Sequence, residues 1–265
     1  MQLRFQKMQG AGNKIVVVDQ RVAGAPDPTE EVLQALRDAA PDEAFDQLMW
    51  LHAPQNPAAA AAYRVFNYDG SEVEQCGNGA RCVAVLLASQ DPQMAEFWLE
   101  SPAGMLQAKV TDAAYASIDM GPPTFDDELT ELDVAGTTVA VSIVSMGNPH
   151  CVLDVPDTAT ADVAGLGAAI ERHDAFPNRT NVGFMQLVDR STIKLRVFER
   201  GVGETLACGT GACAAAALGI RRGQLDSEVA VHLPGGQLMV SWRGAAESVW
   251  LSGAVEFISE GTIDL

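Results

Sequence analysis

The chain contains two similar blocks of sequence, and this internal repeat constrains its fold more than any other feature. Residues Val65–Ala80 recur without a gap as Val197–Ala212, so Cys208 follows Cys76 by 132 residues (208 − 76) in a chain of 265. Each copy reads as a strand, a loop, the run Cys-Gly-X-Gly-Ala and an alanine-rich apolar helix. The repeat predicts two similar domains that face each other and present one thiol each to a shared cleft.

Strand patterns dominate the rest of the chain. Alternating or short apolar runs such as Leu3–Met8 and Ala114–Met120 predict strands. Thr29–Ala39 predicts a helix that begins at a threonine cap, and the Pro- and Ala-rich stretch Pro54–Ala62 predicts a loop. The helices that follow Cys76 and Cys208 are apolar on nearly all sides, which is typical of buried helices.

These patterns indicate the α+β class. We expect two pseudo-symmetric domains, each an antiparallel β-sheet or barrel wrapped around a central α-helix, with the active site in the cleft between them. A Gly- and Pro-rich break at Met120–Thr124 predicts the linker. The expected domains are residues 1–119, to which the tail 256–265 can be added back, and residues 120–255.

Composition excludes several classes of partner. The 35 acidic and 17 basic residues give a net charge of −18, which disfavours nucleic acid and anionic membrane surfaces. Five cysteines without a paired framework, and a start that lacks an apolar signal region, predict free thiols in a reducing cytoplasm. No apolar run approaches the length of a membrane span.

Each Cys-Gly-X-Gly-Ala run lies where a helix begins, and free backbone N–H groups at such a position attract anions. The thiols of Cys76 and Cys208 are therefore expected to ionise more readily than an ordinary cysteine. A substrate carboxylate could take N–H groups from both helix starts. The residues that supply them would be Gly77, Asn78, Gly79, Gly209, Thr210 and Gly211.

Other reactive side chains are assigned by their setting. Cys82 and Cys213 fall inside the helices and are expected to be core residues, and their spacing from Cys76 and Cys208 does not fit zinc. His150, at the start of a predicted strand, is the histidine expected at the site, and its neighbour Cys151 would then face away.

Glu199 and Arg200 belong to the repeated block, at the positions of Asn67 and Tyr68 in the first copy. Glu199 is expected to meet a substrate ammonium group. The planar fork of Arg200 is expected to meet a carboxylate.

The ordered motifs closely resemble the diaminopimelate epimerase family, among the cofactor-independent amino-acid racemases, over nearly the whole chain. The residues that carry the resemblance are Gly10–Asn13, Phe66–Asn67, Asp69–Ser71, Cys76–Gly79, Arg81–Cys82, Gly147–His150, Asn181–Met185, Glu199–Gly201 and Ala207–Gly211. The resemblance implies interconversion of LL- and meso-diaminopimelate in lysine and cell-wall biosynthesis. It implies no pyridoxal phosphate, no other cofactor and no metal.

The resemblance also implies a role for each matched residue. One of Cys76 and Cys208 would act as a thiolate that removes the α-proton, and the other as a thiol that delivers a proton to the opposite face. His150 and Glu199 match positions that tune the two thiols. The matched substrate-binding positions are Asn13, Gln47, Asn67, Gly77, Asn78, Asn148, Asn181, Glu199, Arg200, Gly209 and Thr210. A homodimer is implied as well, although Ser259 stands where many members carry a dimer-contact tyrosine.

Several alternatives share part of this pattern. A racemase for histidine or another amino acid would keep the chemistry, but Asn67, Asn181 and Arg200 favour a substrate with two amino-acid ends. Proline racemases read Cys-Gly-His where this chain has Cys76-Gly77-Asn78, and isomerases of the phenazine type lack the cysteine pair. A binding protein would leave the substrate α-hydrogen unexchanged. A thiol redox protein would cycle through a Cys76–Cys208 disulfide.

Overall fold

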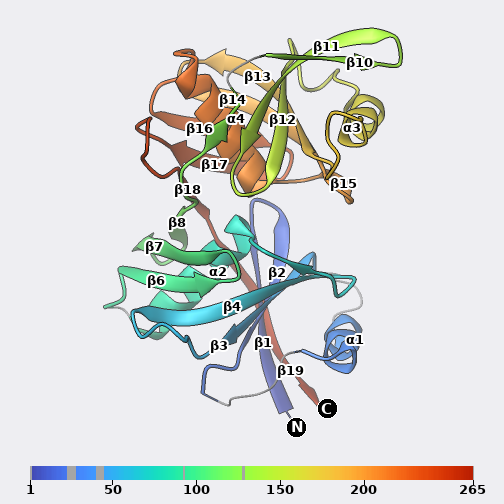
Figure 1. The fold of residues 1–265 in the computed structure, drawn as a ribbon. Coiled ribbons are helices and arrows are strands. Elements are labelled where there is room, and N and C mark those ends of the chain that lie inside the picture. The colour runs from blue at the N-terminus through green and yellow to red at the C-terminus, as the bar shows by residue number, and fades with distance from the viewer. Residues whose placement is uncertain (1, 23–27, 40–44, 92, 127–128, 265) are drawn as a thin grey trace. The chain divides into compact units, whose positions relative to one another are not determined.

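The computed structural model describes residues 2–22, 28–39, 45–91, 93–126 and 129–264. The chain folds into two compact units: unit 1 comprises residues 1–118 and 252–265, and unit 2 comprises residues 119–251 (Figure 1). Residues 252–255 lie in unit 1, where the backbone N–H of Val255 donates to the carbonyl of Ala114 at 2.8 Å. The sequence had assigned them to the second domain, and the domain boundaries as such stay a prediction.

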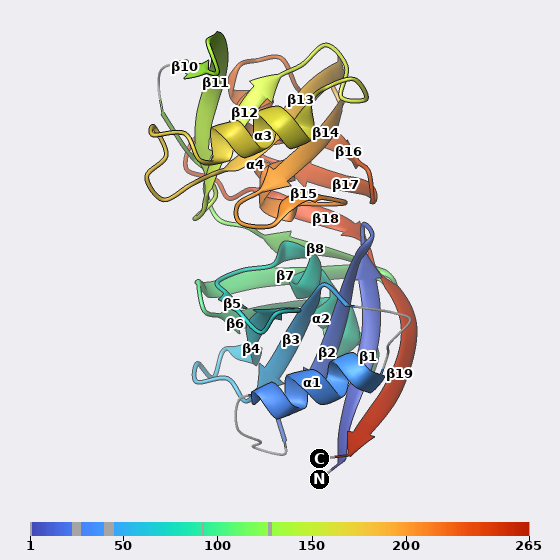
Figure 2. The same ribbon diagram turned by 90° about the vertical axis from the view of Figure 1, so that its right-hand side faces the viewer.

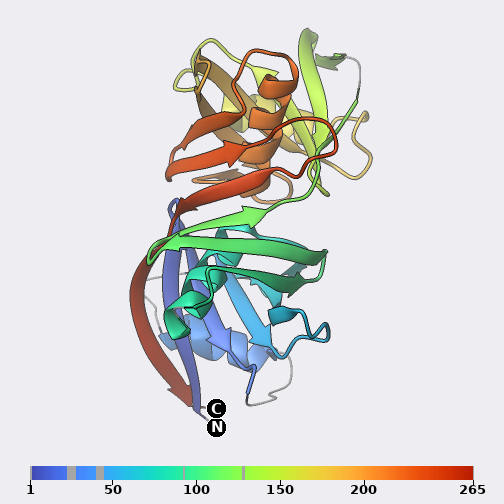
Figure 3. The same cartoon turned by 90° about the vertical axis from the view of Figure 1, so that its left-hand side faces the viewer.

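Unit 1 is a sheet with two helices. Its strands are β1 (Gln2–Gly10), β2 (Asn13–Asp19), β3 (Gln47–His52), β4 (Ala59–Asn67), β5 (Glu72–Val73), β6 (Glu96–Ser101), β7 (Gly104–Asp112), β8 (Tyr115–Asp119) and β19 (Glu256–Asp264), and its helices are α1 (Glu30–Ala39) and α2 (Gly77–Gln90). Neighbouring strands pair in the order β19-β1-β2-β3-β4-β6-β7-β8. The two chain ends lie side by side because Gln2 pairs with Asp264 (Figure 3).

The two helices of unit 1 lie on opposite faces of β1, β2 and β3 (Figure 2). Helix α1 packs Val32, Leu33 and Leu36 against apolar side chains of these strands, and the Thr29 hydroxyl accepts from the N–H of Val32 at 3.3 Å, as a cap should. Helix α2 contacts β1, β2, β3 and β7, and its residues from Gly77 to Leu87 are all buried. A helix that is apolar on nearly all sides is stable only inside such a wrap of strands.

Unit 2 repeats this plan. Its strands are β9 (Thr124–Phe125), β10 (Thr130–Val134), β11 (Thr137–Ser145), β12 (Pro149–Asp154), β13 (Asn181–Asp189), β14 (Thr192–Glu199), β15 (Gly203–Thr205), β16 (Glu228–Leu233) and β17 (Gly236–Ser241), and its helices are α3 (Val163–Glu171) and α4 (Gly209–Arg221). Strand β18 (Trp250–Ala254) begins in unit 2 and ends in unit 1. The strands pair in the order β10-β11-β12-β13-β14-β16-β17. The central helix α4 contacts β11 to β14, β16 and β17, and α3 packs against β10, β13 and β14.

The α+β class and the two-part organisation predicted from the sequence are confirmed, but the sheets are not wholly antiparallel. The pairs β2–β3, β4–β6, β12–β13 and β14–β16 are parallel. Parallel neighbours need a crossover connection, and helices α1, α2, α3 and α4 each lie in one of these crossovers. The stretch Pro54–Ala62 is also not all loop, since β4 begins at Ala59 and pairs there with β6.

The internal repeat extends to a matched ion pair. Arg64 on β4 meets Glu72 on β5 through Nε and Oε1 at 2.7 Å, and Arg196 on β14 meets Glu204 on β15 through the same atoms at 2.6 Å. Both residues of the second pair follow those of the first by 132 positions (196 − 64 and 204 − 72), the same interval that separates the two cysteines. In each unit, an equivalent ion pair therefore joins the long strand of the repeated block to the short strand that follows it.

No helix in the part of the chain that the structure describes is both long enough and apolar enough to cross a membrane.

Candidate active site

Cys76 is the N-cap residue of α2, immediately before the first helical residue, Gly77. Its backbone is extended, and its Sγ accepts a hydrogen bond from the N–H of Gly79 at 3.2 Å. The sulfur therefore takes one of the N–H groups that the first turn of a helix leaves free. Cys76 is half-buried, and its Sγ lies 3.9 Å from Oδ1 of Asn13.

Cys208 is the matching residue at the start of α4, with an extended backbone and Thr210 Oγ1 3.7 Å from its Sγ. It is only 4% exposed, whereas Cys76 is half-buried. Burial and the negative charge of Glu199 raise the pKa of the Cys208 thiol well above its ordinary value. The expectation that this thiol ionises readily is therefore wrong, because loss of hydration and a nearby carboxylate outweigh the N–H groups of the helix start.

Three of the predicted substrate-binding amides in unit 1 are held by hydrogen bonds to other side chains. Gln47 and Asn67 are opposite each other on β3 and β4, and Gln47 Nε2 donates to Asn67 Oδ1 at 3.1 Å. Asn67 Nδ2 in turn donates to the Ser71 hydroxyl at 3.0 Å. Asn13, at the start of β2, donates to the carboxylate of Asp46 at 3.1 Å.

Asn78 lies in the first turn of α2 and is 3% exposed. Its Oδ1 accepts from Nη2 of Arg81, one turn further along the helix, at 3.0 Å. The amide oxygen is thereby occupied by the guanidinium, which fixes the direction in which the amide nitrogen points. Gly77 and Gly79 are buried beside it.

A hydrogen-bonded chain in unit 2 runs from His150 toward Cys208. Asn148 Nδ2 donates to Thr210 Oγ1 at 3.2 Å, and Asn148 Oδ1 lies 3.0 Å from His150 Nε2. Since the amide nitrogen faces Thr210, the amide oxygen faces the imidazole, and His150 Nε2 carries the hydrogen. Burial, with a smaller effect of the Arg200 charge, lowers the pKa of His150 from 6.5 to about 3. The imidazole is therefore neutral near pH 7.

Glu199 is the last residue of β14 and Arg200 follows it, and both are held by groups of unit 2. The Thr205 hydroxyl donates to Glu199 Oε1 at 2.5 Å. Asn181 links two segments, because its Oδ1 accepts from the N–H of Arg200 at 2.9 Å and its Nδ2 donates to the carbonyl of Pro149 at 3.0 Å. The Arg200 side chain reaches the carbonyl of Asn178 at 3.4 Å.

The predicted site residues thus fall into two groups, one in each unit. Unit 1 holds Asn13, Gln47, Asn67, Cys76, Gly77 and Asn78, and unit 2 holds Asn148, His150, Asn181, Glu199, Arg200, Cys208, Gly209 and Thr210. Cys82 and Cys213 are fully buried inside the helices, as predicted, and burial raises the pKa of Cys82 to about 12. Cys151 is also buried, among the apolar residues beneath α3.

Sequence reasoning missed several residues that hold this site. Ser71 could have been predicted, because Asp69-Gly70-Ser71 is a turn pattern in which the aspartate accepts from the N–H two residues later. In the structure, Asp69 Oδ1 accepts from the N–H of Ser71 at 2.9 Å. Asp46 and Thr205 carry no such signal, since each meets its partner through the fold.

Comparison with known proteins matches most of the chain to one family. The model of the family described as diaminopimelate epimerase matches residues 5–125 and 142–258. A diaminopimelate epimerase of Laribacter hongkongensis is 45% identical and one of Teredinibacter turnerae 44% identical, in each case over 100% of both chains. The chain belongs to the diaminopimelate epimerase family.

Solved structures of other families share the fold. A phenazine biosynthesis protein of the PhzF family from Bacillus anthracis aligns with a TM-score of 0.76 at 15% identity over 100% of both chains. A hydroxyproline epimerase from Agrobacterium vitis aligns with a TM-score of 0.72 at 17% identity over 99% of this chain and 92% of its own. At such identities the likeness shows the fold alone, so assignment to the diaminopimelate epimerase family rests on the family model and the curated relatives.

Proposed function

We propose that this protein interconverts LL- and meso-diaminopimelate, with Cys76 and Cys208 as the two proton-transfer groups. The observation that carries the proposal is the matched placement of the two cysteines at the N-cap positions of α2 and α4, in a chain that is 44% to 45% identical over its full length to diaminopimelate epimerases. A fold with two equivalent helix starts, each with one thiol, suits inversion of a carbon centre, because inversion needs one proton donor and one acceptor.

The two thiols have different surroundings, and this difference supports different roles in the resting enzyme. The raised pKa of Cys208 supports a resting state in which Cys208 keeps its proton. Cys76 then acts as the base: its thiolate takes the α-proton, and the electron pair of the broken C–H bond passes to the α-carbon and its carboxylate. The S–H of Cys208 gives a proton to the opposite face. The roles exchange in the reverse direction.

The carbanion must be stabilised as it forms, because an amino-acid α-proton is much less acidic than a thiol. The N–H groups at the starts of α2 and α4 would hold the reacting carboxylate, through Gly77, Asn78, Gly209 and Thr210. Preorganised N–H groups stabilise the developing negative charge without reorganising during the reaction. Glu199 and the neutral His150 would set the protonation of the thiols.

The far end of the substrate supplies selectivity. We assign Asn67, Asn181 and Arg200 to the distal ammonium and carboxylate groups, and Asn13, Gln47, Asn148 and Glu199 to the remaining polar contacts. An analogue without the distal end would leave these groups unpaired, at a cost of about 1–3 kcal/mol for each buried polar group. Selectivity would therefore appear in the affinity for substrates that lack one amino-acid end.

The proposed reaction belongs to lysine and peptidoglycan-precursor biosynthesis in the cytoplasm. The five free cysteines support a reducing compartment. The net charge of −18 supports a protein that does not bind nucleic acid. We also infer a homodimer; Phe257 on β19, 54% exposed, is an apolar side chain of the kind that a dimer covers.

Reduced protein incubated with LL-diaminopimelate, without pyridoxal phosphate, tests the proposal through chiral separation of the isomers. We expect the meso isomer to appear until the two isomers reach a constant ratio. The same ratio should be reached from the meso isomer. Unchanged LL isomer after incubation with folded, reduced protein would contradict the proposed substrate, and binding without conversion would favour a binding protein.

A further inference from the structure

Two charged side chains outside the candidate site, Arg37 and Glu171, hold the loops that carry Asn67 and Arg200. We propose that Arg37 on α1 and Glu171 on α3 are positioning residues, which fix the peptide group that follows Tyr68 in unit 1 and Arg200 in unit 2. The inference rests on the proposed function, because the loops are substrate loops only through it.

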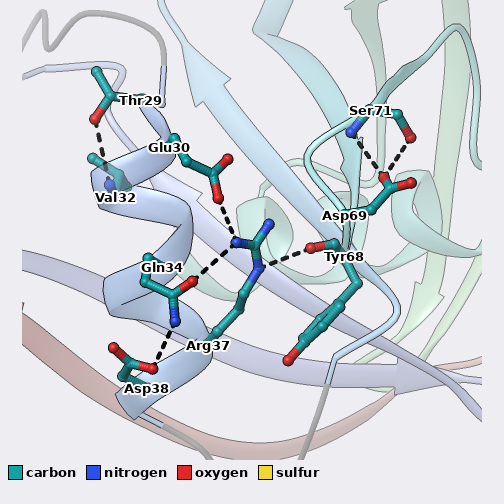
Figure 4. Close-up of polar contacts among 9 residues, drawn as sticks. All are labelled: Thr29, Glu30, Val32, Gln34, Arg37, Asp38, Tyr68, Asp69 and Ser71. Carbon is teal, nitrogen blue, oxygen red and sulfur yellow. Dashed lines mark hydrogen bonds and ion pairs between the residues drawn. The ribbon is translucent and has the colours of Figure 1, made fainter.

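Arg37 fixes the loop of unit 1 from the last turn of α1 (Figure 4). Its Nε donates to the carbonyl of Tyr68 at 2.9 Å, and its guanidinium lies 5.3 Å from the centroid of the Tyr68 ring. The Arg37 side chain is itself held, since Nη1 donates to Glu30 Oε1 at 2.6 Å and to Gln34 Oε1 at 3.3 Å. With 12% exposure, it is a nearly buried link between helix and loop rather than a solvated charge.

The loop fits closely against α1. Gly70 has a φ of +88°, which favours glycine, and a Cβ there would lie 3.2 Å from Leu33 Cδ1 and 3.3 Å from Glu30 Oε2. The backbone N–H of Tyr68 donates to the carbonyl of Asp46 at 3.0 Å. Tyr68 is therefore held on both sides of its Cα, by Asp46 at its N–H and by Arg37 at its carbonyl.

This anchoring bears directly on Asn67, the residue before Tyr68. The loop closes on Asn67 through two backbone bonds, from Asn67 N to Ser71 O at 2.8 Å and from Gly70 N to Asn67 O at 2.9 Å. A rotation of the peptide after Tyr68 would open this turn. It would also change the direction of the Asn67 amide, which Gln47 and Ser71 hold.

In unit 2, Glu171 in the last turn of α3 holds the loop that carries Arg200. Its Oε1 accepts from the N–H of Gly201 at 2.7 Å. The Glu171 side chain is 2% exposed, and its cationic neighbours, Arg172 at 3.3 Å and Arg179 at 3.5 Å, are 72% and 52% exposed. A carboxylate in this setting is costly to bury unless it is hydrogen-bonded, and the Gly201 N–H is its shortest contact.

Arg200 is thereby held on both sides of its Cα, as Tyr68 is. Asn181 Oδ1 accepts from the N–H of Arg200 at 2.9 Å, and Glu171 accepts from the N–H of Gly201, the next residue. Gly201 has a φ of +77°, and no atom lies within 4 Å of the position that its Cβ would take, so its backbone conformation alone favours glycine here.

The two contacts involve the same peptide group of the repeat. The interval of 132 residues that relates the cysteines also relates Tyr68 to Arg200 (200 − 68) and Asp69 to Gly201 (201 − 69). Arg37 donates to the C=O of the peptide between residues 68 and 69, and Glu171 accepts from the N–H of the peptide between residues 200 and 201. The two halves hold one equivalent peptide from its two ends, with side chains of opposite charge.

The experiment compares conservative variants with one control variant in each unit. Arg37→Lys keeps the charge but loses the fork that joins Tyr68 to Glu30, and Glu171→Asp keeps the charge but withdraws the carboxylate by one methylene. Glu171→Gln keeps an oxygen that can accept from Gly201. The controls are Asp38→Ala, whose side chain turns away from Tyr68 toward Gln34 (Figure 4), and Asp226→Asn, an exposed partner of Arg190.

We expect R37K and E171D to raise KM for diaminopimelate about tenfold with a smaller change in kcat, since a lost charge-assisted hydrogen bond is worth about that factor. Hydrogen exchange at the amides of residues 69–71 in R37K and 201–203 in E171D should speed up. E171Q and both controls should stay near the wild type. Unchanged KM and exchange in R37K and E171D would overturn the proposal, and so would loss of folding in both, which would assign these side chains to stability.

Amide exchange separates this inference from the proposed function. If the wild type does not convert diaminopimelate, the proposed function fails, but faster exchange confined to the two loops would still support the anchoring by Arg37 and Glu171. If the wild type converts diaminopimelate and the variants behave like it in KM and exchange, the anchoring inference fails alone.

Discussion

The imidazole of His150 and the amide of Asn148 are joined by a contact of 3.0 Å between Nε2 and Oδ1, inside unit 2. The other end of the same amide donates to Thr210, in the first turn of α4. Because His150 is only 1% exposed, burial keeps its ring neutral. Because Asn148 presents its oxygen to the ring, the hydrogen of the neutral ring lies on Nε2.

Stability should depend on pH through His150. Its pKa is about 3 in the folded protein and 6.5 when exposed, so between these values only the unfolded chain binds the proton. The free energy of unfolding should therefore fall as the pH is lowered through this window, by about 1.4 kcal/mol per pH unit for this one group. Urea unfolding at several pH values between about 5 and 6.5 should give a shallower slope for His150→Gln. The exposed His232→Gln is the control, and equal slopes in both variants would contradict the assignment.

Removal of either site thiol should abolish epimerisation. Cys76→Ala and Cys208→Ala each remove a proton-transfer group, and we expect kcat to fall by about 10²- to 10⁴-fold or more. Cys82→Ala is the matched control, because Cys82 lies on the same helix as Cys76 but is fully buried, and it should keep most of the activity. Full activity in Cys76→Ala would exclude the two-base scheme.

Glu199 should govern the acidity of Cys208. Burial and, after it, the negative charge of Glu199 raise the pKa of that thiol, so Glu199→Gln should lower the pKa. The variant should then be alkylated faster at Cys208 by iodoacetamide at a given pH, as measured by mass spectrometry of the Cys208 peptide. Glu204→Gln changes a carboxylate on the next strand that pairs with Arg196, and it should leave the rate unchanged. Equal rates in both variants would remove Glu199 from this role.

Arg200 should act through the geometry of its guanidinium. Arg200→Lys keeps the charge but loses the planar fork, so KM for diaminopimelate should rise about tenfold. Arg190→Lys, in the exposed pair with Asp226, is the control in steady-state assays. Unchanged KM in Arg200→Lys would show that the substrate does not use the fork.

Local patterns were sufficient to predict α1 and the two helices that follow the site cysteines. Thr29 and the apolar face of the helix that follows it predicted α1, and the alanine-rich runs after Cys76 and Cys208 predicted α2 and α4. The strand at Ala59–Ala62 was missed because alanine has low strand propensity, and its place in β4 depends on pairing with β6. The parallel pairs were missed because the relative direction of neighbouring strands depends on the connections between them, which the periodicity of a single strand does not reveal.

The residues around the candidate site were less accessible to sequence reasoning. The repeat singled out Cys76, Cys208, Glu199 and Arg200, but the raised pKa of Cys208 follows from burial, which a motif does not reveal. Glu171 reads as an ordinary charge at the end of a helix, and only its contact with Gly201, 30 residues away, gives it a role. Such contacts arise from the packing of whole elements, so they carry no local pattern.

The most direct test of the two-base account is to follow deuterium at early times in D₂O, starting from LL-diaminopimelate. A thiol holds a single proton, so a base that returns its proton restores the substrate unlabelled, whereas a second base delivers solvent deuterium to the product. The account predicts deuterium in the meso isomer at once, while the remaining LL isomer is still unlabelled. A meso product that keeps the original hydrogen, or equal labelling of both isomers from the start, would contradict it.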